Sequence, residues 1–187
     1  FLADIDDYRG LLEQKIREAS DIPLHIASLD AGMRGFNPEI ILQGISVEAI
    51  APGSKPQMQL REIRLGLDFL DLLLTQNLLS ASRVTLVGAN ISVIRNEDGS
   101  LSIKGLQESD EKPLWLLKGG KYEILDSRIN WQDLKRHGEA VYFDDIDLVL
   151  KNHYFDQSHE VHLLSKLPHQ YGDSLRISAR IKGDVFA

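Results

Sequence analysis

Cysteine is absent from the 187-residue sequence. Its absence excludes disulfide bonds, thiolate metal sites and cysteine nucleophiles, but it leaves the compartment open because proteins of oxidising compartments can also lack cysteine. Long apolar runs are missing too. The longest stretch, Leu67 to Leu79, is interrupted by four polar residues, so it falls short of the ~18 to 20 residues of a membrane span. No signal peptide is visible.

Positively charged residues are fewer than negatively charged ones. The chain has 21 Lys and Arg against 28 Asp and Glu, a net charge of −7, which argues against nucleic acid as the main partner. With 43% hydrophobic and 26% charged residues, the composition is that of a globular chain. We predict a single domain over residues 1–187, with a helix in 1–20 and a curved β-sheet in 21–187. Because the first residue is Phe1 instead of Met, we expect a piece of a longer protein.

The first twenty residues have helical periodicity. Apolar residues recur at the spacing of one helix face, and acidic residues stand in the first turn, where they suit the helix dipole. The apolar positions are Ile5, Tyr8, Leu12, Ile16 and Ala19. This pattern predicts an amphipathic helix over residues 4–19.

Five later segments share an unusual β-type pattern. Two alternating apolar residues precede a small or acidic residue, and two or more apolar residues follow at an odd separation. The segments are Ile40–Val47, Met58–Leu67, Val84–Val93, Tyr122–Trp131 and Val141–Leu150. Their unequal spacing excludes a repeat of fixed length.

The odd step would send the second apolar pair to the opposite face of a flat strand. One inserted residue, a β-bulge, restores both pairs to one face and bends the strand. The expected bulge residues are Gly44, Glu62, Gly88, Asp126 and Asp145. Alternation continues without a bulge in Val161–Leu164 and Leu175–Ile181. We therefore predict a mainly β fold: a long, bent, bulged antiparallel sheet that forms a curved trough, with the N-terminal amphipathic helix and one or two short helices.

Few segments can cover the apolar face of such a sheet. The candidates are the first helix, Leu67 to Leu79, and a short turn at Pro113–Leu117. Because seven or more long strands carry more apolar surface than these segments shield, the sheet must close, fold over as a sandwich, or leave a groove for an apolar ligand.

No constellation of residues indicates catalysis or metal binding. His159 and His162 would point to opposite faces of a strand and are expected at the surface, and Asp144, Asp145 and Asp147 fit a solvated strand. The Asn96–Gly99 segment fits a hairpin turn. We therefore expect no enzyme activity, no catalytic residue, no metal site and no cofactor.

A set of short segments, in this order and spacing, resembles the region after the single membrane helix in YhdP-type proteins of the AsmA-like family. The resemblance covers nearly the whole chain. The segments are Asp6–Arg9, Pro23–Ile26, Gly32–Glu39, Ile63–Leu65, Leu70–Leu74, Gly88–Ile91, Arg95–Leu101, Trp115–Leu117 and Tyr122–Ile124.

The resemblance implies a bridge-like lipid transfer protein of the Gram-negative envelope, located in the periplasm and held at the inner membrane by an anchor upstream of Phe1. Its implied role is phospholipid transport to the outer membrane along an apolar groove. The implied partners are phospholipid acyl chains, the inner membrane and the rest of the parent chain, with no nucleic acid.

Combined with the alternation, the resemblance predicts the residues that line this groove. They are Ile45, Val47, Ile63, Leu65, Val84, Leu86, Ile91, Val93, Ile129, Trp131, Ile146, Leu148, Leu175 and Ile177. Ile5, Tyr8, Leu12 and Ile16 of the helix are expected to plug the membrane-proximal end. The alternative is a structural module of the periplasm that docks a protein partner and binds no lipid, and a hydrolase of envelope lipids or glycans is the weakest hypothesis.

Overall fold

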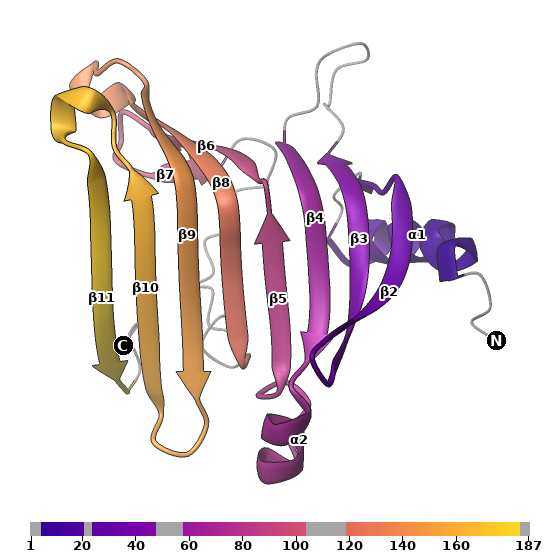
Figure 1. Ribbon diagram of the computed structural model, residues 1–187. Helices are drawn as coiled ribbons and strands as arrows, with labels where there is room; N and C mark the ends of the chain where they lie inside the picture. The colour runs from indigo at the N-terminus through magenta and orange to yellow at the C-terminus, as the bar shows by residue number, and fades with distance from the viewer. Residues whose placement is uncertain (1–4, 21–23, 48–57, 104–118, 184–187) are drawn as a thin grey trace.

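The computed structural model describes residues 5–20, 24–47, 58–103 and 119–183. In these ranges the chain forms one eleven-stranded sheet with short helices at its margins (Figure 1). The strands are β1 Leu24–His25, β2 Ser28–Arg34, β3 Asn37–Val47, β4 Met58–Leu67, β5 Ser82–Val87, β6 Asn90–Arg95, β7 Leu101–Ile103, β8 Lys121–Asp133, β9 Val141–His153, β10 Ser158–Lys166 and β11 Ser174–Lys182. The mainly β class with long strands is confirmed, and the described part is a single sheet and not a sandwich.

The sheet is mixed, which corrects the prediction of a purely antiparallel one. The strand order is β1-β3-β4-β5-β8-β9-β10-β11. In addition, β2 pairs with β3, and β6 pairs with β4, β7 and β8. Strand β8 runs parallel to both β5 and β6, whereas the other pairs are antiparallel. The reason is that β8 begins at the end of the sheet where β5 begins, as the pairing of Lys121 with Arg83 shows.

The N-terminal segment packs on one face of the sheet at the β1–β4 edge (Figure 1). It starts as the 3-10 helix η1 (Ile5–Tyr8) and continues as α1 (Arg9–Ser20). Carboxylates fasten it to the sheet: Asp6 Oδ1 accepts from the Leu29 amide at 2.9 Å, and Glu13 Oε1 accepts from the Ile26 amide at 2.6 Å. The predicted helix is confirmed, with a tighter first turn.

The main core lies under this segment. Ile5 and Leu12 pack against a cluster of buried sheet residues, whereas Tyr8 is exposed. The cluster consists of Ile26, Leu29, Leu42, Ile45, Leu60 and Ala89.

Four of the five predicted kink positions have left-handed backbone angles: φ is 60° at Gly44, 65° at Gly88, 46° at Asp126 and 48° at Asp145. The flanking pairs place them in one narrow band across the sheet. Gly44 lies opposite Arg61, Arg61 opposite Gly88 and Gly88 beside Asp126, whereas Asp145 lies one pair further along, beyond the Ser127–Ile146 pair. We call this band the kink row. Since neighbouring strands change face at the same place, their apolar residues stay on one side both before and after the row.

The kink row leaves no room for side chains at its glycines. A Cβ on Gly44 would lie 2.7 Å from the Ala27 Cβ, and one on Gly88 would lie 2.9 Å from the Arg61 Cβ. The Arg61 side chain crosses this space to reach Asp126, with Nη2 and Oδ2 2.5 Å apart. Glycine is therefore required at both positions, for its conformation and for its size.

The change of face predicted at Glu62 is present, because Leu60 and Ile63 pair with Ile45 and Leu42 on the same side of the sheet, but it involves no left-handed residue. Glu62 pairs regularly with Gln43 and Val87, and no residue of β4 has a positive φ. Glycines lie on both sides of Arg61 in the neighbouring strands, so no cross-strand side chain opposes it, and β4 changes face without a positive φ.

The Leu67 to Leu79 segment does not cover the apolar face, contrary to expectation. It forms the short helix α2 (Phe69–Thr75) at one end of the sheet, beyond β4 (Figure 1). The large apolar side chains of this segment are exposed to solvent, as Leu70 and Leu73 show. The other expected cover, Pro113–Leu117, lies outside the described residues. Within the described ranges, no helix has both the length and the apolar character needed to cross a bilayer.

A first prediction concerns the kink row. Gly44→Ala should lower the free energy of unfolding by roughly 2 kcal/mol or more, because a left-handed alanine costs ~1 to 2 kcal/mol and its methyl meets Ala27. Urea denaturation measures the change. As a control, Gly10→Ala in α1 meets open space and should stabilise by roughly 0.5 to 1 kcal/mol. Equal effects of the two substitutions would contradict the role of the row.

Candidate functional site

Strand register joins apolar side chains into two unbroken rows, each of which crosses eight strands from β2 to β11. The first row is Leu29, Leu42, Ile63, Leu86, Ile124, Leu148, Leu163 and Ile177. The second row is Ala31, Ile40, Leu65, Val84, Tyr122, Leu150, Val161 and Ala179. Beyond the kink row, shorter rows continue the surface through Ile91, Ile129 and Phe143, and through Val93, Trp131 and Val141. We call this side of the sheet the apolar face.

All fourteen residues predicted to line a groove lie on the apolar face. On the side of the kink row nearer to α2 they are Ile63, Leu65, Val84, Leu86, Ile146, Leu148, Leu175 and Ile177. On the far side they are Ile45, Val47, Ile91, Val93, Ile129 and Trp131. The structure therefore brings together residues that are up to 132 positions apart in the chain. Their roles differ, because Ile45, Val47 and Ile146 are buried and Ile91 packs against the main core.

The remaining part of the apolar face is accessible. Leu65 and Ile177 expose 40% and 43% of their surface, and Ile40 and Ile181 are also exposed. Leu86, Ile124 and Leu148, in the middle of the first row, are half-buried. The core under the N-terminal helices reaches Leu86 of β5 and Ile91 of β6, and from β8 to β11 the described helices leave the apolar side chains uncovered.

The sequence-based list missed some members of the rows. Leu29, Ile124, Leu150, Val161 and Leu163 share the apolar face. Ile124 and Leu150 belong to the same alternating segments as residues on the list, and Val161 and Leu163 belong to a recognised run. The signal was present, but only the pairing of strands shows that these residues continue one row.

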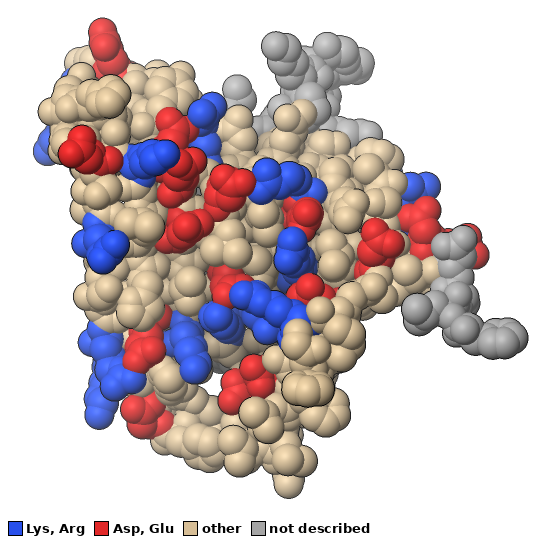
Figure 2. Space-filling view, viewed as in Figure 1, with Lys and Arg blue, Asp and Glu red and all other residues tan. Residues whose placement is uncertain are grey.

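The opposite side, which we call the charged face, carries Lys, Arg, Asp and Glu over most of the strands (Figure 2). Ion pairs neutralise this surface. The most buried pair joins Arg83 to Glu39 at 3.4 Å, with both side chains less than 10% exposed. Arg64 and Glu62 form a more exposed pair at 2.5 Å.

Glu123 is the centre of the charged face, with only 4% of its surface exposed. Its carboxylate accepts from Lys121 Nζ at 2.6 Å, from Thr85 Oγ1 at 2.7 Å and from Arg34 Nη1 at 2.8 Å. Burial alone would raise the pKa of Glu123, but the hydrogen bonds from Lys121, Arg34 and Thr85 outweigh it and lower the pKa to about 2. Glu123 is thus an ionised structural anchor.

The Arg34–Glu123 pair also reports the curvature of the sheet. Arg34 ends β2, and three strands separate β2 from β8 in the sheet, a distance of roughly 19 Å at ~4.8 Å per strand if the sheet were flat. Two side chains cannot span that distance. The tip of the β2–β3 hairpin must therefore curl over the charged face.

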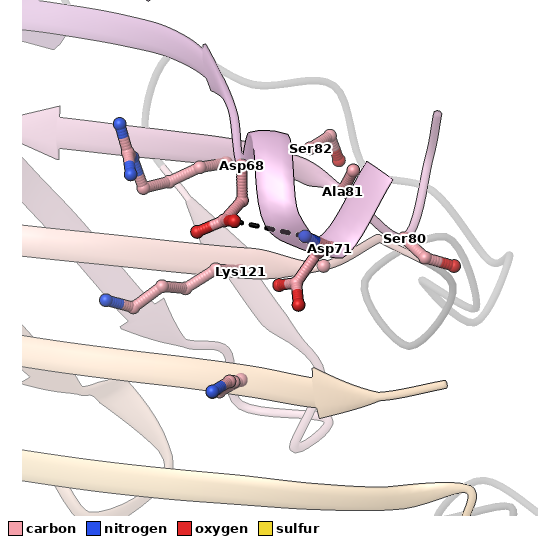
Figure 3. A pocket seen from close by; sticks show the side chains of 9 residues that line it. Asp68, Asp71, Ser80, Ala81, Ser82 and Lys121 are labelled. Atoms are coloured by element: carbon pink, nitrogen blue, oxygen red, sulfur yellow. Dashed lines mark hydrogen bonds between the residues drawn. The ribbon is translucent and has the colours of Figure 1, made fainter. Parts of the chain in front are cut away.

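Two polar pockets lie between α2 and the neighbouring strand ends. The first, of about 130 Å³, is lined by Asp68, Asp71, Ser80, Ala81, Ser82, Arg83, Gly120, Lys121 and Lys151 (Figure 3). The second, of about 260 Å³, shares Asp71, Ser80 and Lys151 and reaches Tyr154 and Phe155. Within the described ranges, no group of His, Asp or Glu is arranged to hold a metal ion. His159, expected at the surface, is buried, with Nδ1 2.6 Å from Asn152 Oδ1.

Comparison with known proteins gives one family. Residues 1–185 match the family model described as YhdP protein. No curated protein and no solved structure matches the chain.

A second prediction concerns Glu123. Since its pKa is about 2 in the folded state against an ordinary 4.5, its contribution to stability is full above pH 4.5 and is lost as the pH falls from 4.5 to 2. Glu123→Gln should therefore cost roughly 2 to 3 kcal/mol at pH 7 and make stability less dependent on pH in that window.

Chemical denaturation at several pH values measures this dependence. Glu97→Gln, in the exposed turn after β6, serves as the control and should keep the profile of the unaltered protein. An unchanged slope between pH 4.5 and 2 in Glu123→Gln would contradict the anchoring role.

Proposed function

The chain belongs to the YhdP family, and from this premise we propose that it takes part in phospholipid transport between the inner and outer membranes of a Gram-negative envelope. In this proposal the apolar face is the wall of a trough that receives acyl chains. The protein acts in the periplasm, anchored at the inner membrane by a segment upstream of Phe1, and it has no enzyme activity. The observation that carries the proposal is the pair of unbroken apolar rows.

The rows have the right length for acyl chains. Eight strands at ~4.8 Å spacing span roughly 34 Å. One leaflet of a bilayer is about 15 Å thick in its hydrocarbon part, half of the ~30 Å core, so a row is about two acyl chains long. A lipid could therefore lie along the rows and be followed by another.

The rows also favour movement over tight binding. Each methylene that leaves water contributes about 0.8 kcal/mol, whichever branched side chain it meets. Because the first row consists of Leu and Ile from strand to strand, its neighbouring positions offer similar free energies to an acyl chain that shifts by one strand. The charged face, with its ion pairs, offers no such surface, so the two sides of the sheet are chemically distinct.

The absence of cysteine allows a direct test, because a single introduced cysteine can carry an environment-sensitive fluorophore. Ile177→Cys places the probe on the apolar face of β11, and Ser178→Cys places it on the other face one residue later. When phospholipid is supplied from vesicles, we expect a blue shift at position 177 and none at 178. Lipid extraction of the purified chain, followed by mass spectrometry, identifies any bound lipid.

A substitution tests the same surface without a probe. Ile177→Asp should reduce lipid uptake at least tenfold, and Ser178→Asp should leave it unchanged, since both residues are exposed and neither belongs to the core. Thermal unfolding checks that both variants fold. If neither probe position responds and no lipid co-purifies, the lipid proposal fails and the protein-docking module becomes the better hypothesis.

A further inference from the structure

Helix α2 is amphipathic, but it is oriented opposite to an ordinary surface helix. Phe69, Leu70, Leu73 and Leu74 point to solvent, with Leu73 72% exposed, whereas the polar residues Asp71 and Thr75 line the pockets against the sheet. Surface helices of globular proteins normally bury their apolar stripe. The following turn adds the exposed Leu78 and Leu79.

This orientation is fixed by hydrogen bonds and is not a frayed end. Asp68 caps the helix by accepting from the amides of Leu70 at 3.1 Å and Asp71 at 3.2 Å. The Phe69 amide donates to Asn37 Oδ1 at 2.9 Å, and the left-handed Gln76 closes the last turn by donating to the Leu72 carbonyl. The apolar side chains are thus held out to solvent by a well-bonded backbone.

Two further tips at the same end of the sheet are apolar. The β2–β3 turn exposes Met33 and Phe36, the latter by 94%, and the β9–β10 turn exposes Tyr154 and Phe155. Figure 1 shows these two turns and α2 at one end of the strands. Among the residues that the structure describes, the turns at the opposite end are mainly polar. They are Asn96–Ser100, Lys135–Ala140 and His169–Asp173.

We propose that this end of the sheet inserts into a lipid surface, with α2 and the two turns entering the interface between head groups and acyl chains. A lipid surface is favoured because the apolar side chains form separate protrusions around polar pockets. A fluid apolar medium accommodates such tips, whereas a protein partner would have to match each one. Aromatic residues such as Phe36, Tyr154 and Phe155 are typical of membrane interfaces. The inference does not depend on whether the apolar face holds lipid.

The charges at this end are mixed, which specifies the kind of lipid surface. Arg83, Lys121 and Lys151 line the pocket behind α2, but Asp68 and Asp71 line it with them (Figure 3). Attraction to anionic lipid is therefore small, and insertion of apolar side chains is the main contribution. Binding should occur on vesicles of neutral phosphatidylcholine and should change less than twofold between 0.1 and 0.5 M salt.

Vesicle flotation with phosphatidylcholine liposomes tests the inference on the purified chain. The double variant L73D/L74D should reduce the bound fraction at least tenfold, and Phe155→Asp should reduce it at least threefold. Tyr171→Asp, at an exposed position of the opposite end, should leave it unchanged. All altered residues are exposed, and thermal unfolding checks that each variant folds.

Three results would overturn the inference. They are no flotation of the unaltered chain, a loss of the bound fraction in Tyr171→Asp equal to that in L73D/L74D, and a more than tenfold fall of the bound fraction between 0.1 and 0.5 M salt. Full binding by Phe155→Asp would overturn the three-tip geometry. The fluorophore at Ile177→Cys gives an independent readout. In L73D/L74D it should still respond to detergent-solubilised phospholipid, so failure of membrane docking and failure of acyl-chain binding are distinguishable.

Discussion

The alignment of the kink row is the constraint on which the remaining architecture depends. A left-handed residue in one strand reverses the side-chain alternation of that strand alone, and a neighbour without a matching change would then present polar groups beside apolar ones. Here Gly44, Gly88 and Asp126 change face along one line and Asp145 changes face one pair further on, so the apolar residues on both sides of the kink row form a single surface. Without that alignment the strands could pair, but the sheet would have no continuous apolar side.

The two faces of the sheet are stabilised in different ways. On the apolar face, hydrophobic burial is concentrated at the β1–β4 edge, where Ile5 and Leu12 complete the core, and it decreases toward β11. On the charged face, Glu123 joins β2 to β8 through Arg34 and thereby holds a curl that backbone pairing alone does not specify. The stability of the molecule is therefore distributed unevenly, and the half of the sheet with the most accessible apolar surface depends most on backbone hydrogen bonds.

The sequence predicted features that depend on neighbouring residues, such as the kinks, and missed features that depend on distant parts of the chain, such as the direction of β8. The odd steps in the apolar alternation predicted the kinks at Gly44, Gly88, Asp126 and Asp145, because a small or acidic residue that tolerates left-handed angles stands at each step. At Glu62 the same rule predicted the change of face between Leu60 and Ile63, but this strand has no left-handed residue. Nothing in the sequence of residues 104–118 indicates the direction in which the chain re-enters the sheet, so the parallel placement of β8 could not be predicted. The exposure of α2 was missed because periodicity shows that a helix has two faces but not which one meets the sheet.

The kink row also restricts how a sequence of this kind can change in length. Each strand has a fixed number of residues between its turn and the row, and this number decides which side chains point to which face. Gain or loss of a single residue within β3 or β9 would turn apolar side chains of that strand to the charged face and polar ones to the apolar face. A change of two residues would keep each side chain on its own face. Insertions and deletions are therefore expected outside the strands. Related chains should accordingly align without gaps across the strands even where their residues differ.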